Sequence, residues 1–479
     1  MPISRRQFLK RTGLMTAGAV AAPSFFRNPL LQQALAATDN YLLIFYLDGG
    51  NDGLNTIVPA DNGGVGSAAL RDMYQIARNA PGSGGIRIAS GNLLIPDNPA
   101  PPMIDPNTGS QLGFHPGLAG IKDLYDDGNA VVVQGVGYPS PNLSHDESAR
   151  RWESGDPFEV LPEGGWLGRY LADNYGGTEI PGVNIRNTVA PEFEQGTTGV
   201  LALRNVDDVA FPYPNVSVPE IALLSDAFGA IHADAIPSSL VPFRHTGSTG
   251  AIVQQATEAY ALLDSDYVND RAVFNAAYTG LASGVARDLR EIAKVIYGVA
   301  NDTYPGIVTA HFFEARQTGY DTHSDQGAGA AGARQFNLFD DMSQAIKLFY
   351  EDVSTMAPGL GQKITILVWS EFSRRIRQND TGTDHGSQGP VFLIGGGLNG
   401  GVVGNHPNID PLALNADGNT VYSQDGGDGF RSTDLRDIYG TVLKHWLGMA
   451  DPSPFLPVDS GPAATRWTAS DFDLPIFAP

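Results

Sequence analysis

Apolar runs that alternate with amphipathic stretches constrain the fold of this chain most. The runs cover residues 41–47, 130–136, 307–313, 364–369 and 391–394. A strand that is apolar on both faces suits the centre of a sheet that is covered by helices. The stretches between the runs repeat apolar residues at three- and four-residue spacing, which is typical of helices that pack on a sheet. The pattern therefore predicts an α/β fold with a central, mostly parallel β-sheet flanked by helices.

Four of these predicted strands end in polar residues. The four clusters are Asp48, then Ser144 with His145, then Asp321 with His323, and finally Glu371 with Asp384 and His385. In open α/β sheets, ligands bind beyond the carboxyl ends of the strands. Carboxylates and imidazoles are typical of metal ligands and of acid–base groups. One such cluster is equally typical of a capped turn with a solvated loop, but four at successive strand ends indicate a common site.

Ser144 precedes a predicted helix that runs from Asp146 to Trp152. At a helix N-terminus, the dipole and the free N–H groups favour an anion and assist a nucleophilic hydroxyl. The alternative is a plain serine N-cap in front of an acidic first turn. The sequence leaves both interpretations open.

The composition limits the partners and the ligands. The formal net charge of −22 argues against nucleic acid or an anionic membrane as a partner. The chain contains no cysteine, so any metal must be held by His, Asp, Glu, Asn or a hydroxyl group. Oxygen ligands with a few imidazoles leave Zn, Mn, Mg and Ca as candidate divalent metals.

The first residues carry a twin-arginine motif. Ser4 to Lys10 reads SRRQFLK, a weakly apolar stretch follows over residues 12–22, and Ala34-Leu35-Ala36 offers small residues to a signal peptidase. We therefore expect residues 1–36 to be a removable twin-arginine export signal, with the twin-arginine translocase as a partner during export. The mature protein is expected in the periplasm or outside the cell. The apolar stretch is too short to span a membrane, and we expect no integral membrane segment in the mature chain.

The rest of the chain, residues 37–479, is expected to form a single α/β domain. Its 57 glycines and 33 prolines predict many loops. Residues 176–245 place short strand-like pieces among prolines, so we expect an insertion there.

Six motifs resemble the DUF1501 family of exported bacterial proteins, and the resemblance covers nearly the whole mature chain. The motifs are Asp48-Gly-Gly-Asn-Asp-Gly-Leu-Asn-Thr56, Tyr138-Pro-x-Pro-Asn-Leu-Ser-His145, Trp152-x-Ser-Gly155, Tyr320-Asp-Thr-His323, Glu371-Phe-Ser-Arg-Arg375 and Gly382-Thr-Asp-His-Gly386. That family is similar to the alkaline phosphatase and sulfatase superfamily, whose members place one or two metals beyond the strands of an α/β sheet. The resemblance therefore implies an alkaline-phosphatase-like sheet and a metal-dependent hydrolase of phosphate or sulfate esters.

The resemblance also implies roles for individual residues. The implied metal ligands are Asp48, Asp321, His323, Glu371, Asp384 and His385, with Glu371 alternatively acting as a base behind the ligands. As a separate mechanistic hypothesis, Arg374 or Arg375 would clamp the anionic ester through paired hydrogen bonds, although surface salt bridging is an alternative.

The nucleophile is where the chain departs from the phosphatase pattern. When Trp152-Glu-Ser-Gly155 is matched to the phosphatase helix, His145 rather than Ser144 falls on the nucleophile position. This leaves open a shifted serine, a histidine that acts as nucleophile or ligand, and a site without hydrolysis. The substrate is expected to be an anionic ester or a polysaccharide-type molecule. The alternative function is a non-catalytic secreted protein that binds or helps to assemble cell-surface polymer, with a structural metal site.

Overall fold

The structure is a computed structural model. The residues that it describes are 39–63, 69–80, 84–97, 100–161, 164–175, 180–195, 199–206, 259–260, 262–302, 308–410, 431–457 and 473–478. The predicted export signal lies outside the described residues, as does most of the predicted insertion at 176–245. Within the described part of the chain, no helix has both the length and the apolar character needed to cross a membrane.

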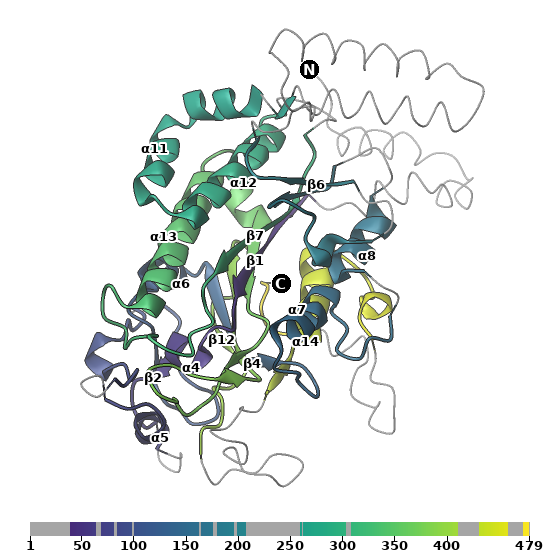
Figure 1. Cartoon of the computed structure of the whole chain (residues 1–479). Helices are drawn as coiled ribbons and strands as arrows, with labels where there is room; N and C mark the ends of the chain where they lie inside the picture. The colour runs from purple at the N-terminus through teal and green to yellow at the C-terminus, as the bar shows by residue number, and fades with distance from the viewer. Residues whose placement is uncertain are drawn as a thin grey trace, which may run out of the picture.

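Among the described residues, a nine-stranded sheet forms the centre of the fold (Figure 1). The order along the sheet is β12-β4-β11-β8-β1-β7-β5-β6, and β13 also pairs with β4. These strands are β1 (Tyr41–Asp48), β4 (Ala130–Gly137), β5 (Gly182–Ile185), β6 (Val200–Leu203), β7 (Phe312–Thr318), β8 (Ile364–Trp369), β11 (Gly389–Gly395), β12 (Gly401–Val403) and β13 (Thr433–Asp434). Two small sheets pair β2 (Ile57–Pro59) with β3 (Leu112–Phe114), and β9 (Ser373–Arg374) with β10 (His385–Gly386).

Strand direction gathers the polar clusters at one edge of the sheet. In its described part, every strand pairing is parallel except those of β11, which runs antiparallel to both β8 and β4. The carboxyl ends of β4, β8, β1 and β7 therefore meet at the same edge. Because β11 begins at that edge, the connection over residues 370–388 leaves β8 and returns beside it. The predicted order of strand, polar loop and strand is confirmed there.

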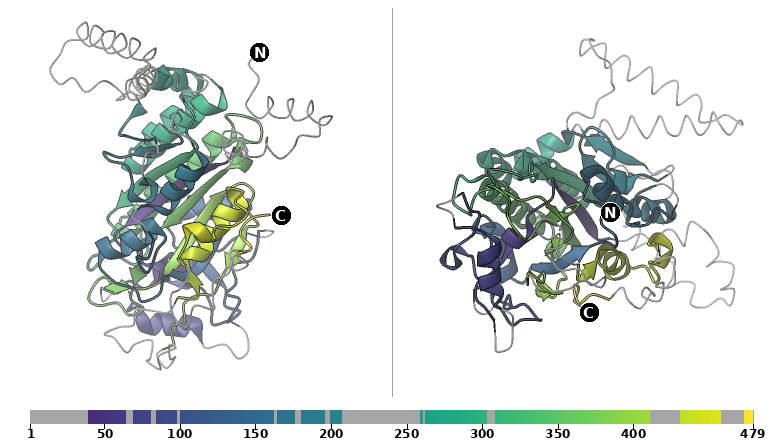
Figure 2. Two further views of the ribbon diagram at one scale, coloured as in Figure 1. Left: turned by 90° about the vertical axis from the view of Figure 1, so that its right-hand side faces the viewer. Right: turned by 60° about the horizontal axis from the view of Figure 1, so that its bottom comes forward.

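Helices cover both faces of the sheet (Figures 1 and 2). The α-helices are α4 (Gly53–Thr56), α5 (Leu70–Ala77), α6 (Ala119–Asp126), α7 (His145–Ser154), α8 (Trp166–Asn174), α11 (Ala272–Leu281), α12 (Gly284–Ala300), α13 (Arg334–Ser354) and α14 (Leu435–Thr441). Short 3₁₀ turns are η2 (Ser90–Asn92), η3 (Pro191–Phe193), η5 (Leu360–Lys363) and η7 (Ser453–Phe455), and η6 (Val442–Trp446) is π-helical.

The central strand β1 is buried on both faces, as its apolar run predicts. Leu43 and Phe45 pack into the core beneath α6, α12 and α13. Leu42 and Ile44 pack into the opposite core beneath α7, α8 and α14. The side chains alternate because successive residues of a strand point to opposite faces. The predicted fold class, a mostly parallel sheet between layers of helices, is confirmed.

One predicted boundary is wrong. The strand predicted at 307–313 is β7, Phe312–Thr318, because its second half carries the polar side chains of Glu314 and Arg316 rather than an apolar run. Near the C-terminal end of the fold, residues 433–434 pair with β4 as β13, and α14 follows them. The N-cap of α14 is Asp434, which forms a capping box with Asp437.

Candidate metal centre

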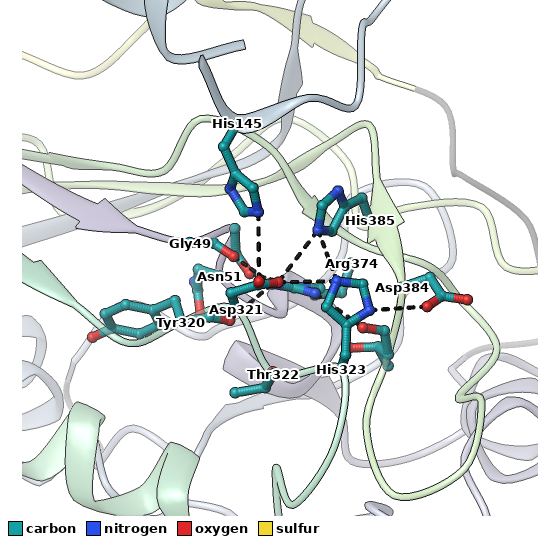
Figure 3. A network of polar contacts seen from close by, with 12 residues as sticks. Gly49, Asn51, His145, Tyr320, Asp321, Thr322, His323, Arg374, Asp384 and His385 are labelled. Atoms are coloured by element: carbon teal, nitrogen blue, oxygen red, sulfur yellow. Dashed lines mark hydrogen bonds and ion pairs between the residues drawn. The ribbon is translucent and has the colours of Figure 1, made fainter. Parts of the chain in front are cut away.

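The carboxylate of Asp321, just beyond β7, lies at the middle of the polar cluster (Figure 3). Its Oδ1 atom is 3.3 Å from Nε2 of His385, and its Oδ2 atom is 3.6 Å from Nε2 of His145. One ligand atom from each of these three residues lies within 4.8 Å of the others. His145 begins α7 after β4, and His385 lies in β10 between β8 and β11. Three separate connections therefore form one group that is able to hold a metal ion.

Hydrogen bonds to Nδ1 fix the tautomers of both histidines. Nδ1 of His145 is 2.7 Å from Oε1 of Glu371, and Nδ1 of His385 is 2.7 Å from the carbonyl oxygen of Leu143. These oxygens accept hydrogen bonds, so Nδ1 carries the proton and Nε2 of each neutral ring keeps a lone pair. Both lone pairs face the carboxylate of Asp321. A cation bound by these three residues would satisfy all three groups, and metal-binding histidines in proteins are oriented by such partners.

Glu371 is fully buried behind His145. Its carboxylate also accepts hydrogen bonds from the N–H of Gly49, at 3.0 Å, and from the hydroxyl of Ser370, at 3.1 Å. The hydrogen bond with Glu371 raises the pKa of His145, whereas burial lowers the pKa of His385. The surrounding carboxylates thus favour a positive charge at Nε2 of His145, whether it is a proton or a metal ion. Glu371 therefore lies behind His145 and outside the group of three residues.

Arg374 differs from the ester clamp that the hydrolase hypothesis predicts. Its side chain is fully buried and binds Oδ1 of Asp321 at 2.6 Å. Its other hydrogen bonds go to the backbone carbonyls of Gly49, Gly50, Tyr320 and Thr383. All three guanidinium nitrogens are therefore bonded to the protein, and Arg374 positions Asp321. Burial by itself would raise the pKa of Asp321, but Arg374 outweighs it and lowers that pKa to about 2.

His323 and Asp384 extend the cluster towards solvent. Nε2 of His323 is 3.0 Å from Nε2 of His385 and 3.1 Å from Oδ1 of Asp321. Nδ1 of His323 is 3.0 Å from Oδ1 of Asp384. Arg375 lies on the far side of Asp384, with 3.9 Å between Nη1 and Oδ2, which fits the salt-bridging alternative for this arginine. The structure thus brings both predicted Asp/His pairs together.

Asp48 lies outside the group of three ligand residues. Its Oδ2 atom faces Arg316, 3.5 Å from Nη1, and burial followed by the charge of Glu371 raises its pKa. Asp48 therefore borders the centre, next to Gly49, instead of contributing an oxygen to it.

Ser144 is exposed at the N-cap of α7. Its hydroxyl makes no capping hydrogen bond, and its N–H donates to Oδ1 of Asn142 at 2.9 Å. The plain N-cap interpretation therefore lacks the hydrogen bond that defines it.

Close backbone approaches around the centre require glycine. Gly49 has a φ angle of +124°, and a Cβ atom there would lie 2.4 Å from the backbone nitrogen of Asp321. A Cβ atom on Gly382 would lie 2.2 Å from the carbonyl oxygen of Thr322. These two glycines let the loops after β1, β7 and β8 pack against one another.

The sequence gives no indication of a buried network of polar side chains that lies behind the centre. Asp52 and Arg78 form a 2.8 Å ion pair, and both side chains are fully buried. Asp52 also accepts a 2.6 Å hydrogen bond from Gln326, whose side-chain oxygen binds the hydroxyls of Thr322 and Thr383. Asp52 lies in a recognisable Asp/Gly/Asn motif, but only the fold shows which distant residues it meets.

The chain was compared with curated proteins, solved structures and protein-family models. No curated protein matches the chain. Among solved structures, the chain is similar to the lipoteichoic acid synthase LtaP from Listeria monocytogenes, with 10% identity and a TM-score of 0.28, over 88% of this chain and 76% of that one. At this TM-score the likeness supports no argument, and the link to the phosphatase and sulfatase superfamily stays a prediction. The family model described as "Protein of unknown function (DUF1501)" matches residues 308–425, the segment that carries Asp321, His323, Glu371, Asp384 and His385.

Proposed function

We propose that this protein is an exported, divalent-metal-dependent hydrolase of phosphate or sulfate esters. The observation that carries the proposal is the orientation of two histidines. Nδ1–H bonds to Glu371 and Leu143 turn the Nε2 atoms of His145 and His385 towards Asp321. Export rests on the twin-arginine motif near the start of the chain.

The donor set favours a particular class of metal. Two imidazole nitrogens and one carboxylate suit Zn²⁺ or Mn²⁺ better than Mg²⁺ or Ca²⁺, which prefer oxygen ligands. Catalytic zinc sites commonly use three protein ligands and leave one position open. A bound divalent ion would polarise an ester oxygen and lower the pKa of a hydroxyl or water from about 16 towards 7.

The residues of this chain supply orientation and charge. Glu371 holds the ring of His145, and Arg374 keeps the carboxylate of Asp321 ionised. These contacts commit His145 to ligand binding. We therefore assign the nucleophile to Ser144, whose hydroxyl is exposed and makes no capping hydrogen bond at the N-terminus of α7.

An ester screen tests the proposal. Purified protein, supplied with Zn²⁺ or Mn²⁺, is assayed on p-nitrophenyl phosphate and p-nitrophenyl sulfate, together with Asp321→Ala and Ser144→Ala variants. We expect turnover of one ester, loss of both metal and turnover in Asp321→Ala, and loss of turnover alone in Ser144→Ala. Turnover that persists in Ser144→Ala would assign the attack to water. Failure to bind metal, even after folding in its presence, would overturn the proposal.

One observation favours the second candidate, a non-catalytic secreted protein that binds or helps to assemble cell-surface polymer. The side chain of Arg374 is fully buried and binds the protein through all three guanidinium nitrogens, so it is not exposed to an ester at the centre. Bound metal without turnover of any ester would support this structural function.

A further inference from the structure

A hollow of about 670 Å³ lies at the edge of the sheet where β5, β6 and β7 end. Its lining residues include Arg186, Arg204, Arg287 and Arg316, and one acidic residue, Asp288. Arg186 follows β5, Arg204 follows β6 and Arg316 lies near the end of β7, while Arg287 and Asp288 lie in the first turns of α12. Among the lining residues, four arginines outnumber one carboxylate, in a chain with a formal net charge of −22. We call this feature the arginine hollow.

The arginines keep donors for a ligand. A guanidinium has five N–H groups. Within the described part of the chain, Arg186 contacts Glu314 through Nη1, and Arg316 contacts Asp48 through Nη1. Arg204 donates through Nε to the neutral side chain of Asn187.

The fourth arginine, Arg287, binds Asp288 through Nε and Nη2 while more than half of its side chain stays exposed. Paired N–H donors of this kind match the geometry of phosphate and sulfate oxygens.

The arginine hollow and the candidate centre share an edge of the sheet. β7 supplies Arg316 to the hollow and is followed by Asp321 of the centre. Asp48 lies between them, 3.5 Å from Arg316 and adjacent to Gly49, whose N–H binds Glu371.

We infer that the arginine hollow binds a second anionic group of the substrate, so that the substrate is a polyanion with repeated phosphate or sulfate groups. One group is held by the arginines while a neighbouring group reaches the metal centre. The volume falls in the range of about 300–1,000 Å³ that is typical of sites for whole small molecules, which exceeds the need of a single phosphate. That the second anionic group assists turnover rests on the proposed function. That the arginine hollow binds such a group does not rest on it.

Titration calorimetry on the full chain tests the binding. The probes are tripolyphosphate and sucrose octasulfate, as phosphate and sulfate polyanions, with inorganic phosphate as the single-group reference. We expect one polyanion to bind the wild type at least about tenfold more tightly than inorganic phosphate does. The probe that binds more tightly identifies the class of ester.

A double variant, Arg204→Gln with Arg287→Gln, should weaken the binding of that polyanion by at least about tenfold. Arg150→Gln is the control, because Arg150 is similarly exposed but lies on α7 and outside the hollow. Thermal unfolding checks that each variant is folded. Equal polyanion affinity in the folded double variant and the wild type would overturn the inference.

The result can also separate this inference from the proposed function. A wild-type protein that binds a polyanion tightly but hydrolyses no ester refutes the proposed function alone. A wild-type protein that hydrolyses p-nitrophenyl phosphate, but binds both polyanions no better than inorganic phosphate, refutes only the inference that the arginine hollow binds a second anionic group.

Discussion

Replacing Glu371 with glutamine tests how the candidate metal centre is oriented. The carboxylate lies 2.7 Å from Nδ1 of His145 and accepts the N–H of Gly49 at 3.0 Å. Glutamine has the same shape, and its side-chain oxygen can accept both of these hydrogen bonds. In the variant, Ser370 can turn its single hydroxyl proton from residue 371 to the carbonyl of Leu47, 2.7 Å away, and its oxygen then accepts from the glutamine amide. Glu371→Gln therefore removes a charge and leaves the packing in place.

The expected loss follows from the difference between charged and neutral hydrogen bonds. A hydrogen bond to a charged group contributes about 1.5–3 kcal/mol and a neutral one about 0.5–1.5 kcal/mol. His145 thus loses on the order of 1–2 kcal/mol of support, which corresponds to a roughly 5- to 30-fold weaker metal affinity. Competition between the protein and a fluorescent chelator for Zn²⁺ measures this change, and urea denaturation of the metal-free variant checks its fold.

Glu147→Gln provides the matched control. Glu147 lies on α7, as His145 does, but forms a surface ion pair with Arg150 at 2.7 Å. The Glu147→Gln variant should keep the zinc affinity of the wild type, because exposed ion pairs contribute little to stability. An unchanged affinity in a folded Glu371→Gln variant would refute the assignment of His145 as a ligand that Glu371 orients.

Three further predictions concern buried residues of the fold. Asp52→Asn leaves the buried guanidinium of Arg78 without its counter-charge, so the free energy of unfolding in urea should fall by about 3–5 kcal/mol; a loss below about 1 kcal/mol would contradict this. Gly49→Ala should lower the free energy of unfolding by about 1–3 kcal/mol and weaken zinc binding, because its Cβ atom would lie 2.4 Å from the backbone nitrogen of Asp321. If the variant kept the zinc affinity of the wild type, the loop would not be constrained in this way. Burial, followed by nearby negative charge, raises the pKa of Glu192 to about 8, above its value of about 4.3 in an unfolded chain. The folded state therefore binds more protons between these values, and this part of the stability is lost as the pH rises from about 4 to about 8. Thermal unfolding across this range should show a shallower pH dependence for Glu192→Gln, and an unchanged slope would contradict the assignment.

The sheet was predictable because its central strands are apolar on both faces. β1 and β8 have the residues expected from the sequence, with one residue added to β1. β7 was placed too early, since Glu314 and Arg316 interrupt the apolar pattern within the strand. Glu314 is tolerated in the sheet because Arg186, from a neighbouring connection, pairs with it at 3.2 Å. Such a pairing depends on tertiary structure and leaves no local pattern.

The candidate centre was predictable as a set of strand ends but not as a set of roles. Parallel strands bring Asp321 and His145 to one edge, as the polar clusters indicate. Whether His145 or Ser144 faces the centre depends on how α7 starts after β4, which the sequence leaves open. The role of Arg374 depends on the complete burial of its guanidinium. The sequence shows only two adjacent arginines and does not indicate which of them is buried.

The central claim is that His145, Asp321 and His385 hold a divalent metal ion. Crystals of the protein grown with Zn²⁺, with diffraction data collected above and below the zinc absorption edge, test it most directly. The account predicts an anomalous peak in contact with Nε2 of His145, Nε2 of His385 and a carboxylate oxygen of Asp321. An anomalous map without a peak at these three side chains, in crystals that contain zinc elsewhere, would contradict it.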